Sequence, residues 1–408
     1  MHRRNFLATA IGVPAILKSA TGRQGYSWTE IEKFLDKGDV KGRVSREDIP
    51  TPALLVDLNA FESNVQKMAS HAKQFRKTLR PHGKTHKCPE VAQALIRAGA
   101  VGACTAKLSE AEVFAREGVT GLLVTCEVVG KRKIERAVRL AAKHPQTMFC
   151  VDNAQNVRDL DEAAAAAKVK LNLAVDLLVS GRTGVPPGEP ALALAQLIGT
   201  LKNVKLAGIQ SYAGGASHVI GFDKRREVSH NWMNQAVETR RMFEKGGLPC
   251  PLLTGGSTGT YNIDCEIDGV TELQPGSFVF MDVDYNRIGG KDGAVYQDFQ
   301  NSLSVLTTIV STPSKTRAIC DGGLKAFSTD RQFPPEARKN PGVEYIWDGD
   351  EHGILNIAKA TAPVNLGDRM EFVIPHCDPS VNLYDRLYCM RGESLEAVWR
   401  ISARGMSQ

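Results

Sequence analysis

The sequence of 408 residues is poor in the features that mark several common classes of protein. Its nine cysteines are scattered and form no Cys-x-x-Cys pair, so they predict reduced structural thiols rather than a disulfide framework. The formal net charge is only +6 and is spread along the chain, so neither a nucleic-acid partner nor a membrane partner is predicted. What remains is the composition of a large globular protein, longer than one ordinary domain.

The N-terminus differs from the rest of the chain. Arg3 and Arg4 precede a short apolar run that ends at Leu17 and is followed by small residues. This order resembles a twin-arginine export signal, and the run is too short to span a membrane. It predicts delivery of the folded protein to the periplasm; an ordinary basic N-terminus on a cytoplasmic protein is the alternative. Residues 1–24 are therefore left out of the prediction of the fold.

Between residues 51 and 254, short apolar segments alternate with predicted helices. The apolar segments are nearly continuous, as expected for a parallel sheet that is covered by helices. About eight such alternations over roughly 230 residues are typical of a (β/α)8 barrel. A doubly wound open sheet is the alternative, but no Gly-x-Gly-x-x-Gly turn follows the first predicted strand, at 53–57. We therefore predict a barrel over residues 48–285.

The pattern changes after residue 282. Segments rich in threonine and valine alternate polar with apolar residues there and are separated by Gly and Pro, which is typical of antiparallel strands. We predict a second, all-β domain over residues 286–408, together with an N-terminal arm at 25–47. Its predicted strands are 302–311, 317–320, 369–374 and 396–401.

The segment Arg80-Pro81-His82-Gly83-Lys84-Thr85-His86-Lys87 is the first candidate site. Its proline and glycine end a short predicted strand, so Lys84 lies where a strand gives way to a loop. In an extended chain His82, Lys84 and His86 share one face. A lysine between imidazoles in a confined loop is a candidate for a depressed pKa, which an amine nucleophile needs near neutral pH. A solvated basic loop is the alternative.

Four motifs together resemble a known family. They are Thr51-Pro52-Ala53-Leu54-Leu55-Val56-Asp57, the segment 80–87, Gly181-Arg182-Thr183-Gly184 and Pro375-His376-Cys377-Asp378-Pro379. The chain from about residue 48 onward resembles the D-threonine aldolase and D-serine dehydratase branch of the fold-type III pyridoxal-phosphate enzymes, the class that includes alanine racemase. The resemblance implies that Lys84 holds pyridoxal 5'-phosphate covalently. It also implies a homodimer, in which the barrel of one subunit meets the β domain of the other.

His376 and Asp378 form a candidate metal site. In an extended chain both side chains project to one side while Cys377 turns away, and an imidazole and a carboxylate can hold a divalent ion. A lone His-x-Asp pair is weak evidence by itself, but in the resembled family this position is the metal site. Dehydratases of the branch typically have a cysteine where Asp378 stands, whereas aldolases have an aspartate. The pair accepts Mn²⁺, Mg²⁺ or Co²⁺ as readily as Zn²⁺.

The remaining candidate site residues come from the resemblance. A glycine-rich loop at 255–260 suits a phosphate group, because its backbone N–H groups and hydroxyls would lie at the rim of a barrel. The resemblance assigns the phosphate to Thr258, Gly276 and Ser277, and the rest of the cofactor to Arg182 and Tyr212. Asp321 and His352 also fall in family-like segments and are expected at the site, although both are more often turn residues.

These observations predict an aldolase that depends on pyridoxal phosphate and a divalent metal. It would cleave D-β-hydroxy-α-amino acids, such as D-threonine, to glycine and an aldehyde. A D-serine or D-threo-3-hydroxyaspartate dehydratase is the alternative, and a non-catalytic pyridoxal-phosphate-binding protein is a remote one. The sequence leaves open whether a histidine near Lys84 or a metal-bound hydroxide is the base.

Overall fold

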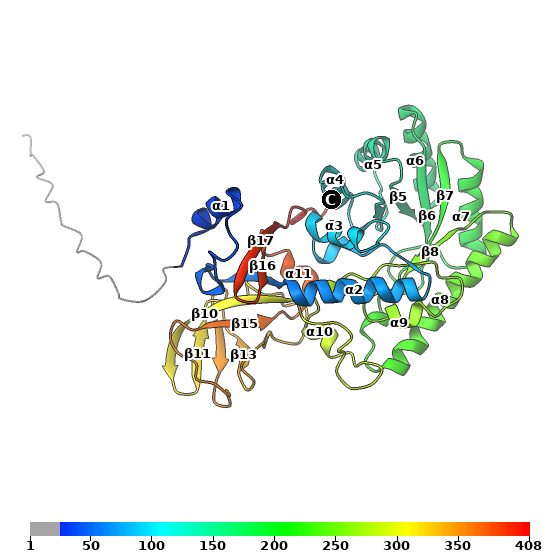
Figure 1. Cartoon of the computed structure of the whole chain (residues 1–408). Coiled ribbons are helices and arrows are strands. Elements are labelled where there is room, and N and C mark those ends of the chain that lie inside the picture. The colour runs from blue at the N-terminus through cyan, green and yellow to red at the C-terminus, as the bar shows by residue number, and fades with distance from the viewer. Residues whose placement is uncertain (1–24) are drawn as a thin grey trace, which may run out of the picture.

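A computed structural model describes residues 25–408, so the export signal predicted at 1–24 lies outside the described residues (Figure 1). Two sheets organise this part of the chain: an eight-stranded parallel sheet and a nine-stranded, largely antiparallel sheet. Within it, no helix is both long enough and apolar enough to cross a bilayer.

The parallel sheet is a closed barrel. Its strands follow the order β2-β9-β8-β7-β6-β5-β4-β3, and a parallel bridge between His82 and Cys104 joins the two ends of the order. This arrangement confirms the predicted (β/α)8 barrel. The strands are β2 (Thr78–Leu79), β3 (Cys104–Thr105), β4 (Leu123–Val124), β5 (Met148–Val151), β6 (Leu171–Asp176), β7 (Val204–Ser211), β8 (Leu252–Gly255) and β9 (Glu272–Leu273).

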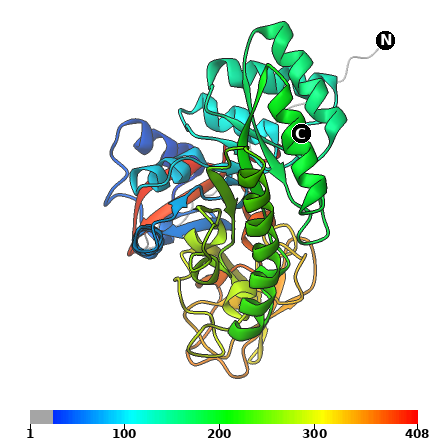
Figure 2. The same ribbon diagram turned by 90° about the vertical axis from the view of Figure 1, so that its right-hand side faces the viewer.

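Helices cover the outside of the barrel, because each buries its apolar stripe against the strands and leaves its charged face in solvent. The longest, α8, runs along the barrel in Figure 2. The covering helices are α2 (Leu58–Gln74), α3 (Pro89–Arg97), α4 (Leu108–Arg116), α5 (Lys131–Lys143), α6 (Ala154–Ala167), α7 (Glu189–Thr200), α8 (Phe222–Lys245) and the short α9 (Tyr261–Asp264).

The second sheet confirms the predicted C-terminal antiparallel β structure. Its order is β11-β14-β13-β12-β15-β10-β1-β16-β17. The N-terminal arm, which contains α1 (Trp28–Asp36), packs on this sheet through a small apolar cluster of its own. The strands from the C-terminal part of the chain are β10 (Leu303–Ser314), β11 (Arg317–Cys320), β12 (Glu336–Ala337), β13 (Glu344–Trp347), β14 (Gly353–Asn356), β15 (Arg369–Val373), β16 (Arg386–Arg391) and β17 (Ser394–Arg400).

One strand belongs to a different sheet from the one that its sequence indicated. The segment expected to open the barrel alternation is β1 (Ala53–Asp57), and it pairs antiparallel with β10 and parallel with β16. Leu54 and Val56 face the large core shared with the barrel, whereas Ala53 and Leu55 face the cluster formed with the N-terminal arm. Because both of its faces are buried, β1 has the same continuous apolar sequence as a barrel strand.

Candidate functional site

A cavity of about 250 Å³ lies at the carboxyl ends of the barrel strands, where segments of the second sheet meet them. This is the end of a (β/α)8 barrel at which active sites are built. All eight site residues predicted from the sequence line its wall: Lys84, Arg182, Tyr212, Thr258, Gly276, Ser277, His376 and Asp378.

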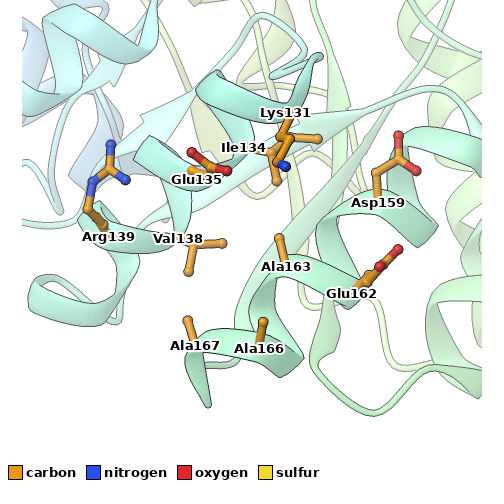
Figure 3. A pocket seen from close by; sticks show the side chains of 10 residues that line it. All are labelled: Lys131, Ile134, Glu135, Val138, Arg139, Asp159, Glu162, Ala163, Ala166 and Ala167. Atoms are coloured by element: carbon orange, nitrogen blue, oxygen red, sulfur yellow. The ribbon is translucent and has the colours of Figure 1, made fainter.

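A larger cavity, of about 650 Å³, lies elsewhere, between α5 and α6 (Figure 3). Its floor is aliphatic, with Ile134, Val138 and Ala163, and charged side chains such as Lys131 and Asp159 stand at its edges. It contains no histidine, cysteine or hydroxyl group, and it lies on the outer helices rather than at the strand ends. The smaller cavity is therefore the candidate active site.

Lys84 stands in a 3-10 turn, Gly83–Thr85, directly after β2. The chain turns here because the ring of His82 accepts the Lys84 backbone N–H at 3.3 Å, and because Gly83 has no Cβ to clash with Phe114, whose ring would be 2.5 Å away. The expectation of an extended chain is therefore wrong. His82 lines the cavity with Lys84, but His86 is buried beneath, stacked on Phe114.

The electrostatic surroundings of Lys84 also differ from the expectation. Its pKa is raised, first by Tyr212, whose ring centre is 5.7 Å from Nζ, and then by Asp378, whose Oδ1 is 3.5 Å away. Burial lowers the pKa of His82 well below its ordinary value and that of His86 to about 3. The two imidazoles are therefore neutral and do not repel the ammonium, whereas a carboxylate attracts it.

Tyr212 and Arg182 form one side of the cavity. Tyr212 follows β7, and two cations approach the centre of its ring: Nζ of Lys84 at 5.7 Å and the guanidinium carbon of Arg182 at 5.5 Å. Arg182 belongs to the loop after β6. That loop is fixed by Thr183, which donates to Asp176 at 3.0 Å, and by Ser180, which donates to the Tyr212 carbonyl at 3.1 Å.

Thr258, Gly276 and Ser277 come together from the loops after β8 and β9. The Thr258 hydroxyl accepts the backbone N–H of Phe278 at 3.0 Å, which fastens the two loops to each other. Gly276 approaches the Lys84 turn so closely that a Cβ would lie 2.6 Å from the Thr85 hydroxyl. Within residues 25–408, these two loops offer hydroxyl and backbone groups to the cavity and contribute no lysine or arginine to its lining, which is the chemistry of a phosphate site on a barrel rim.

His376 and Asp378 meet beside the Lys84 turn, where the Thr85 hydroxyl donates to Asp378 at 3.1 Å. His376 precedes the short helix α11 (Cys377–Val381), so the pair converges at the start of a helix and not along an extended chain as expected. Nε2 of His376 is 4.0 Å from Oδ2 of Asp378. Cys377 points into the core, where its thiol donates to the Met281 carbonyl. No group of three or more metal-ligating side chains was found within residues 25–408, so the protein offers two ligands here.

Asp330 orients this pair, and sequence reasoning missed it. Its Oδ2 lies 2.7 Å from Nδ1 of His376, which leaves Nε2 directed at Asp378. A metal-binding histidine usually donates its second ring N–H to a carboxylate in this way. The arrangement therefore fits a divalent ion held by His376 and Asp378. Asp330 lies 46 residues from its partner, so the sequence carried no local signal for it.

His218 is the second functional side chain that the sequence left unassigned. It ends a 3-10 turn, Ala216–His218, lines the cavity, and has Nδ1 2.7 Å from Oδ2 of Asp284. The same carboxylate is 3.5 Å from Nε of Arg331, which also lines the cavity. Burial raises the pKa of Asp284, but the nearby His218 and Arg331 outweigh it and lower the pKa, so a carboxylate stands beside the imidazole.

Two expected residues do not reach the cavity wall. Asp321 accepts hydrogen bonds from the Thr51 hydroxyl at 2.6 Å and from the Thr308 backbone at 2.8 Å, so it ties β10 to the segment before β1. His352 is exposed beside β14. Neither is among the residues that line the cavity.

A (β/α)8 barrel with a lysine after its first strand, a phosphate-type rim and an attached antiparallel β domain defines a fold-type III pyridoxal-phosphate enzyme. Comparison with known proteins agrees. The chain belongs to the alanine racemase N-terminal domain family, which matches residues 56–284, and residues 302–390 match a serine dehydratase domain.

Individual relatives cover nearly the whole chain. A D-threonine aldolase of Arthrobacter sp is 37% identical over 88% of this chain and 94% of its own. A 3-hydroxy-D-aspartate aldolase of Paracoccus denitrificans is 36% identical over 89% and 94%. A D-threo-3-hydroxyaspartate dehydratase of Delftia sp. is 28% identical over 79% and 87%. The crystal structure of a D-threonine aldolase from Filomicrobium marinum, 36% identical, covers 89% of this chain and 98% of that one with a TM-score of 0.84.

Proposed function

We propose that the protein is a pyridoxal-phosphate- and divalent-metal-dependent aldolase that cleaves D-β-hydroxy-α-amino acids to glycine and an aldehyde. The observation that carries the proposal is the convergence of Lys84, Asp378 and His376: Asp378 lies 3.5 Å from the lysine nitrogen and 4.0 Å from the imidazole. A covalent cofactor site and a metal site would therefore share one cavity. The similarity to two aldolases, at 37% and 36% identity, supports the same reaction class.

The residues of the cavity fit pyridoxal phosphate. Lys84 would hold the aldehyde carbon, Thr258, Gly276 and Ser277 would hold the phosphate, and Tyr212 would contact the ring. When bound, the cofactor supplies an electron sink for the pair released when a bond to Cα breaks. The fit rests on the donor set: hydroxyl and backbone groups on the loops after β8 and β9, and a partly buried lysine after β2.

His376 and Asp378 would hold the metal, with water or substrate oxygens completing its shell. A divalent ion lowers the pKa of a bound hydroxyl and fixes its orientation. The carboxylate of Asp330 behind His376 supports this assignment, because it directs Nε2 toward the shared position. Cys377, the residue with a softer ligand atom, is turned into the core. The site thus has an N/O donor pair, as the aspartate at 378 indicated.

We assign the base to His218. Both ring nitrogens of His82 are engaged, one by the Lys84 N–H and one by Thr125, and His86 does not line the cavity. Nδ1 of His218 lies 2.7 Å from Asp284, so Nε2 would be the nitrogen that takes the proton from the β-hydroxyl oxygen of the substrate. Asp284 then stabilises the charged imidazole. This arrangement favours a histidine base over a metal-bound hydroxide, although the histidine is not one of those beside Lys84.

The alternative reaction is dehydration of the same class of substrate. In that reaction Lys84 would remove the α-proton, a divalent ion held by His376 and Asp378 would supply Lewis acidity at the departing β-hydroxyl group, and hydrolysis of the released imine would give a keto acid and ammonia. The Delftia relative, a dehydratase, supports this alternative at lower identity. The same side chains serve both reactions, so product analysis decides between them.

The test is to incubate the purified protein, pyridoxal phosphate and Mn²⁺ with D-threonine, D-serine and D-threo-3-hydroxyaspartate, and to quantify glycine and ammonia separately. Glycine without ammonia is the expected result. Ammonia with a keto acid would establish a dehydratase. Neither product, with the cofactor still bound, would overturn both proposals in favour of a non-catalytic cofactor-binding protein or another substrate class.

Two further proposals concern the cellular location and the oligomeric state of the protein. We propose export by the twin-arginine route, on the strength of Arg3, Arg4 and the apolar run after them. Replacing both arginines by lysine should retain the protein in the cytoplasm, and unchanged periplasmic activity would contradict the proposal. We also propose a homodimer, as the family resemblance implies; a monomeric mass by light scattering at micromolar concentration would refute it.

A further inference from the structure

Arg225, in α8, is fully buried, with 0% of its surface exposed. Arginine is rarely buried completely unless a carboxylate balances its charge. Within residues 25–408 no ion pair joins Arg225 to a carboxylate. Asp298 interacts electrostatically with Arg225 from beyond ion-pair distance. Its carboxylate accepts hydrogen bonds from Tyr261 and Asn262. The aromatic rings of Phe222 and Tyr296 lie 5.8 and 5.9 Å from the guanidinium carbon.

Every hydrogen bond that Arg225 donates ends on a neutral backbone carbonyl. Nε donates to Gly259 at 2.8 Å, Nη1 donates to Val219 and to Ile288 at 2.9 Å each, and Nη2 donates to Gly289 at 2.7 Å. These bonds satisfy the donors, but they do not neutralise the charge. The protein therefore holds an unbalanced positive charge in a dry interior, where screening by water and salt is weak.

The charge lies directly behind the predicted phosphate loop. Gly259 follows Thr258, which lines the cavity, and the Tyr296 hydroxyl donates to the Thr258 carbonyl at 2.6 Å. The carbonyl groups of two successive residues, Thr258 and Gly259, therefore both accept hydrogen bonds from buried donors, Tyr296 and Arg225. Because a trans peptide directs its N–H opposite to its C=O, the Gly259 N–H points away from Tyr296. A Cβ at Gly259 would lie 2.1 Å from the Ser217 carbonyl, so only glycine fits.

Within residues 25–408, the loops that carry Thr258, Gly276 and Ser277 contribute no lysine or arginine to the lining of the cavity. Two of the lining cations, Lys84 and Arg182, face the Tyr212 ring, and the third, Arg331, is beside Asp284 and Asp330. A phosphate monoester carries between about −1.5 and −2 charges at neutral pH. Hydroxyl and N–H groups can bind such a group, but they leave its net charge unbalanced.

We propose that Arg225 supplies, through the wall of the cavity, the positive charge that balances the cofactor phosphate at the loop of Thr258 and Gly259. Arg225 is a positioning residue: it touches the loop and not the cofactor. It also fixes Val219, next to His218, so the same side chain sets the phosphate loop and the histidine loop in one arrangement. The proposal concerns binding of the phosphate, and it holds whichever reaction the site performs.

The test compares two ligands that differ only in the phosphate. The full-length protein, freed of cofactor, is titrated with pyridoxal phosphate and with pyridoxal, and binding is followed by the absorbance of the bound ring. Arg225→Met should weaken pyridoxal phosphate by ~10- to 100-fold, the effect of removing one charge across a partly screened distance, and leave pyridoxal within about twofold. Arg225→Lys, which keeps the charge but loses the planar set of donors, should retain most of the preference for the phosphate form.

Tyr296→Phe is the matched control, because it removes a donor from the same loop without changing the charge. It should weaken pyridoxal phosphate by much less than Arg225→Met does and leave pyridoxal nearly unchanged, because the loop would hold only the phosphate. Equal weakening of both ligands in Arg225→Met would overturn the proposal and reduce Arg225 to a scaffold residue. So would unchanged affinity for both ligands, or loss of the phosphate preference in Arg225→Lys as complete as in Arg225→Met.

If Arg225→Met does not fold, the wild-type protein still decides the question. The ³¹P resonance of bound pyridoxal phosphate, followed with pH, should show a dianion that persists well below the second pKa of a free phosphate monoester, which is about 6. Titration of the bound phosphate at that free value would overturn the proposal, because a nearby buried cation must favour the dianion.

Discussion

The buried ion pair between Arg80 and Glu272 gives the sharpest prediction for the stability of the barrel. Nε and Nη2 of Arg80 donate to the two carboxylate oxygens at 2.9 and 3.0 Å, and the side chains are only 10% and 2% exposed. Thr254 donates to the same carboxylate at 2.8 Å, and Arg80 also donates to the Gly121 carbonyl. The pair therefore joins β2, β8 and β9 to the segment before β4.

Glu272→Gln should destabilise the protein by about 3–5 kcal/mol, the cost of leaving a buried charge without its partner. The amide neutralises one side of the pair and turns an N–H group toward donors that need an acceptor, so the Arg80 charge remains in the interior. The matched control is Glu238→Gln. Glu238 pairs with Arg241 on the surface of α8, with side chains 67% and 62% exposed, and its loss should cost less than about 1 kcal/mol.

The assay is urea unfolding followed by circular dichroism, with both variants and the wild-type protein measured at equal concentration. A midpoint for Glu272→Gln that lies within error of the Glu238→Gln midpoint would refute the reasoning, because it would mean that the pair is solvated. The double variant Arg80→Met/Glu272→Met should recover part of the loss, since it leaves no buried charge behind. A double variant less stable than Glu272→Gln would show that shape, not charge, determines the effect.

Four other outcomes are expected. Lys84→Ala should abolish the cofactor adduct that borohydride traps; an undiminished adduct would assign the cofactor to another lysine. Asp378→Ala should remove metal-dependent turnover while the cofactor stays bound, and wild-type activity that survives complete chelation would exclude the metal pair. His218→Asn should lower kcat by ~10²- to 10⁴-fold with cofactor affinity unchanged, whereas a wild-type kcat would exclude it as the base. Burial raises the pKa of Asp264 from 3.8 to about 6, so its protonated form favours folding below pH ~4 and that contribution is lost as the pH rises to ~6. The stability of the wild-type protein relative to Asp264→Asn should therefore fall by about 3 kcal/mol over that range of pH, and a difference independent of pH would contradict the assignment.

The sequence predicted most of the fold because local patterns encode it. Short continuous apolar runs separated by helix signals indicated the barrel, and alternation after residue 282 indicated the antiparallel sheet. The prediction for the first strand was wrong. β1 is buried on both faces and so has the composition of a barrel strand, but it pairs with β10 and β16 in the second sheet. Pairing partners are set by tertiary packing, which a single strand does not encode.

Short, distinctive motifs also indicated the candidate residues for the cofactor and the metal, which are Lys84, His376 and Asp378. The residues that orient these side chains could not be predicted from the sequence. Asp330 lies 46 residues before His376, and Asp284 lies 66 residues after His218. A single aspartate or histidine in a loop is common, and only its neighbour in space gives it a role.

The sequence by itself therefore determined which elements form and which residue types carry the chemistry: a lysine after an early strand, a glycine-rich rim, and a histidine two positions before an aspartate. The tertiary structure decided how those groups act. It placed Asp378 beside Lys84 and raised the lysine pKa, where sequence reasoning expected two imidazoles to lower it. It also buried Arg225 behind the loop of Thr258 and Gly259. Charge and burial depend on distances between segments far apart in the chain, and only the folded chain fixes those distances.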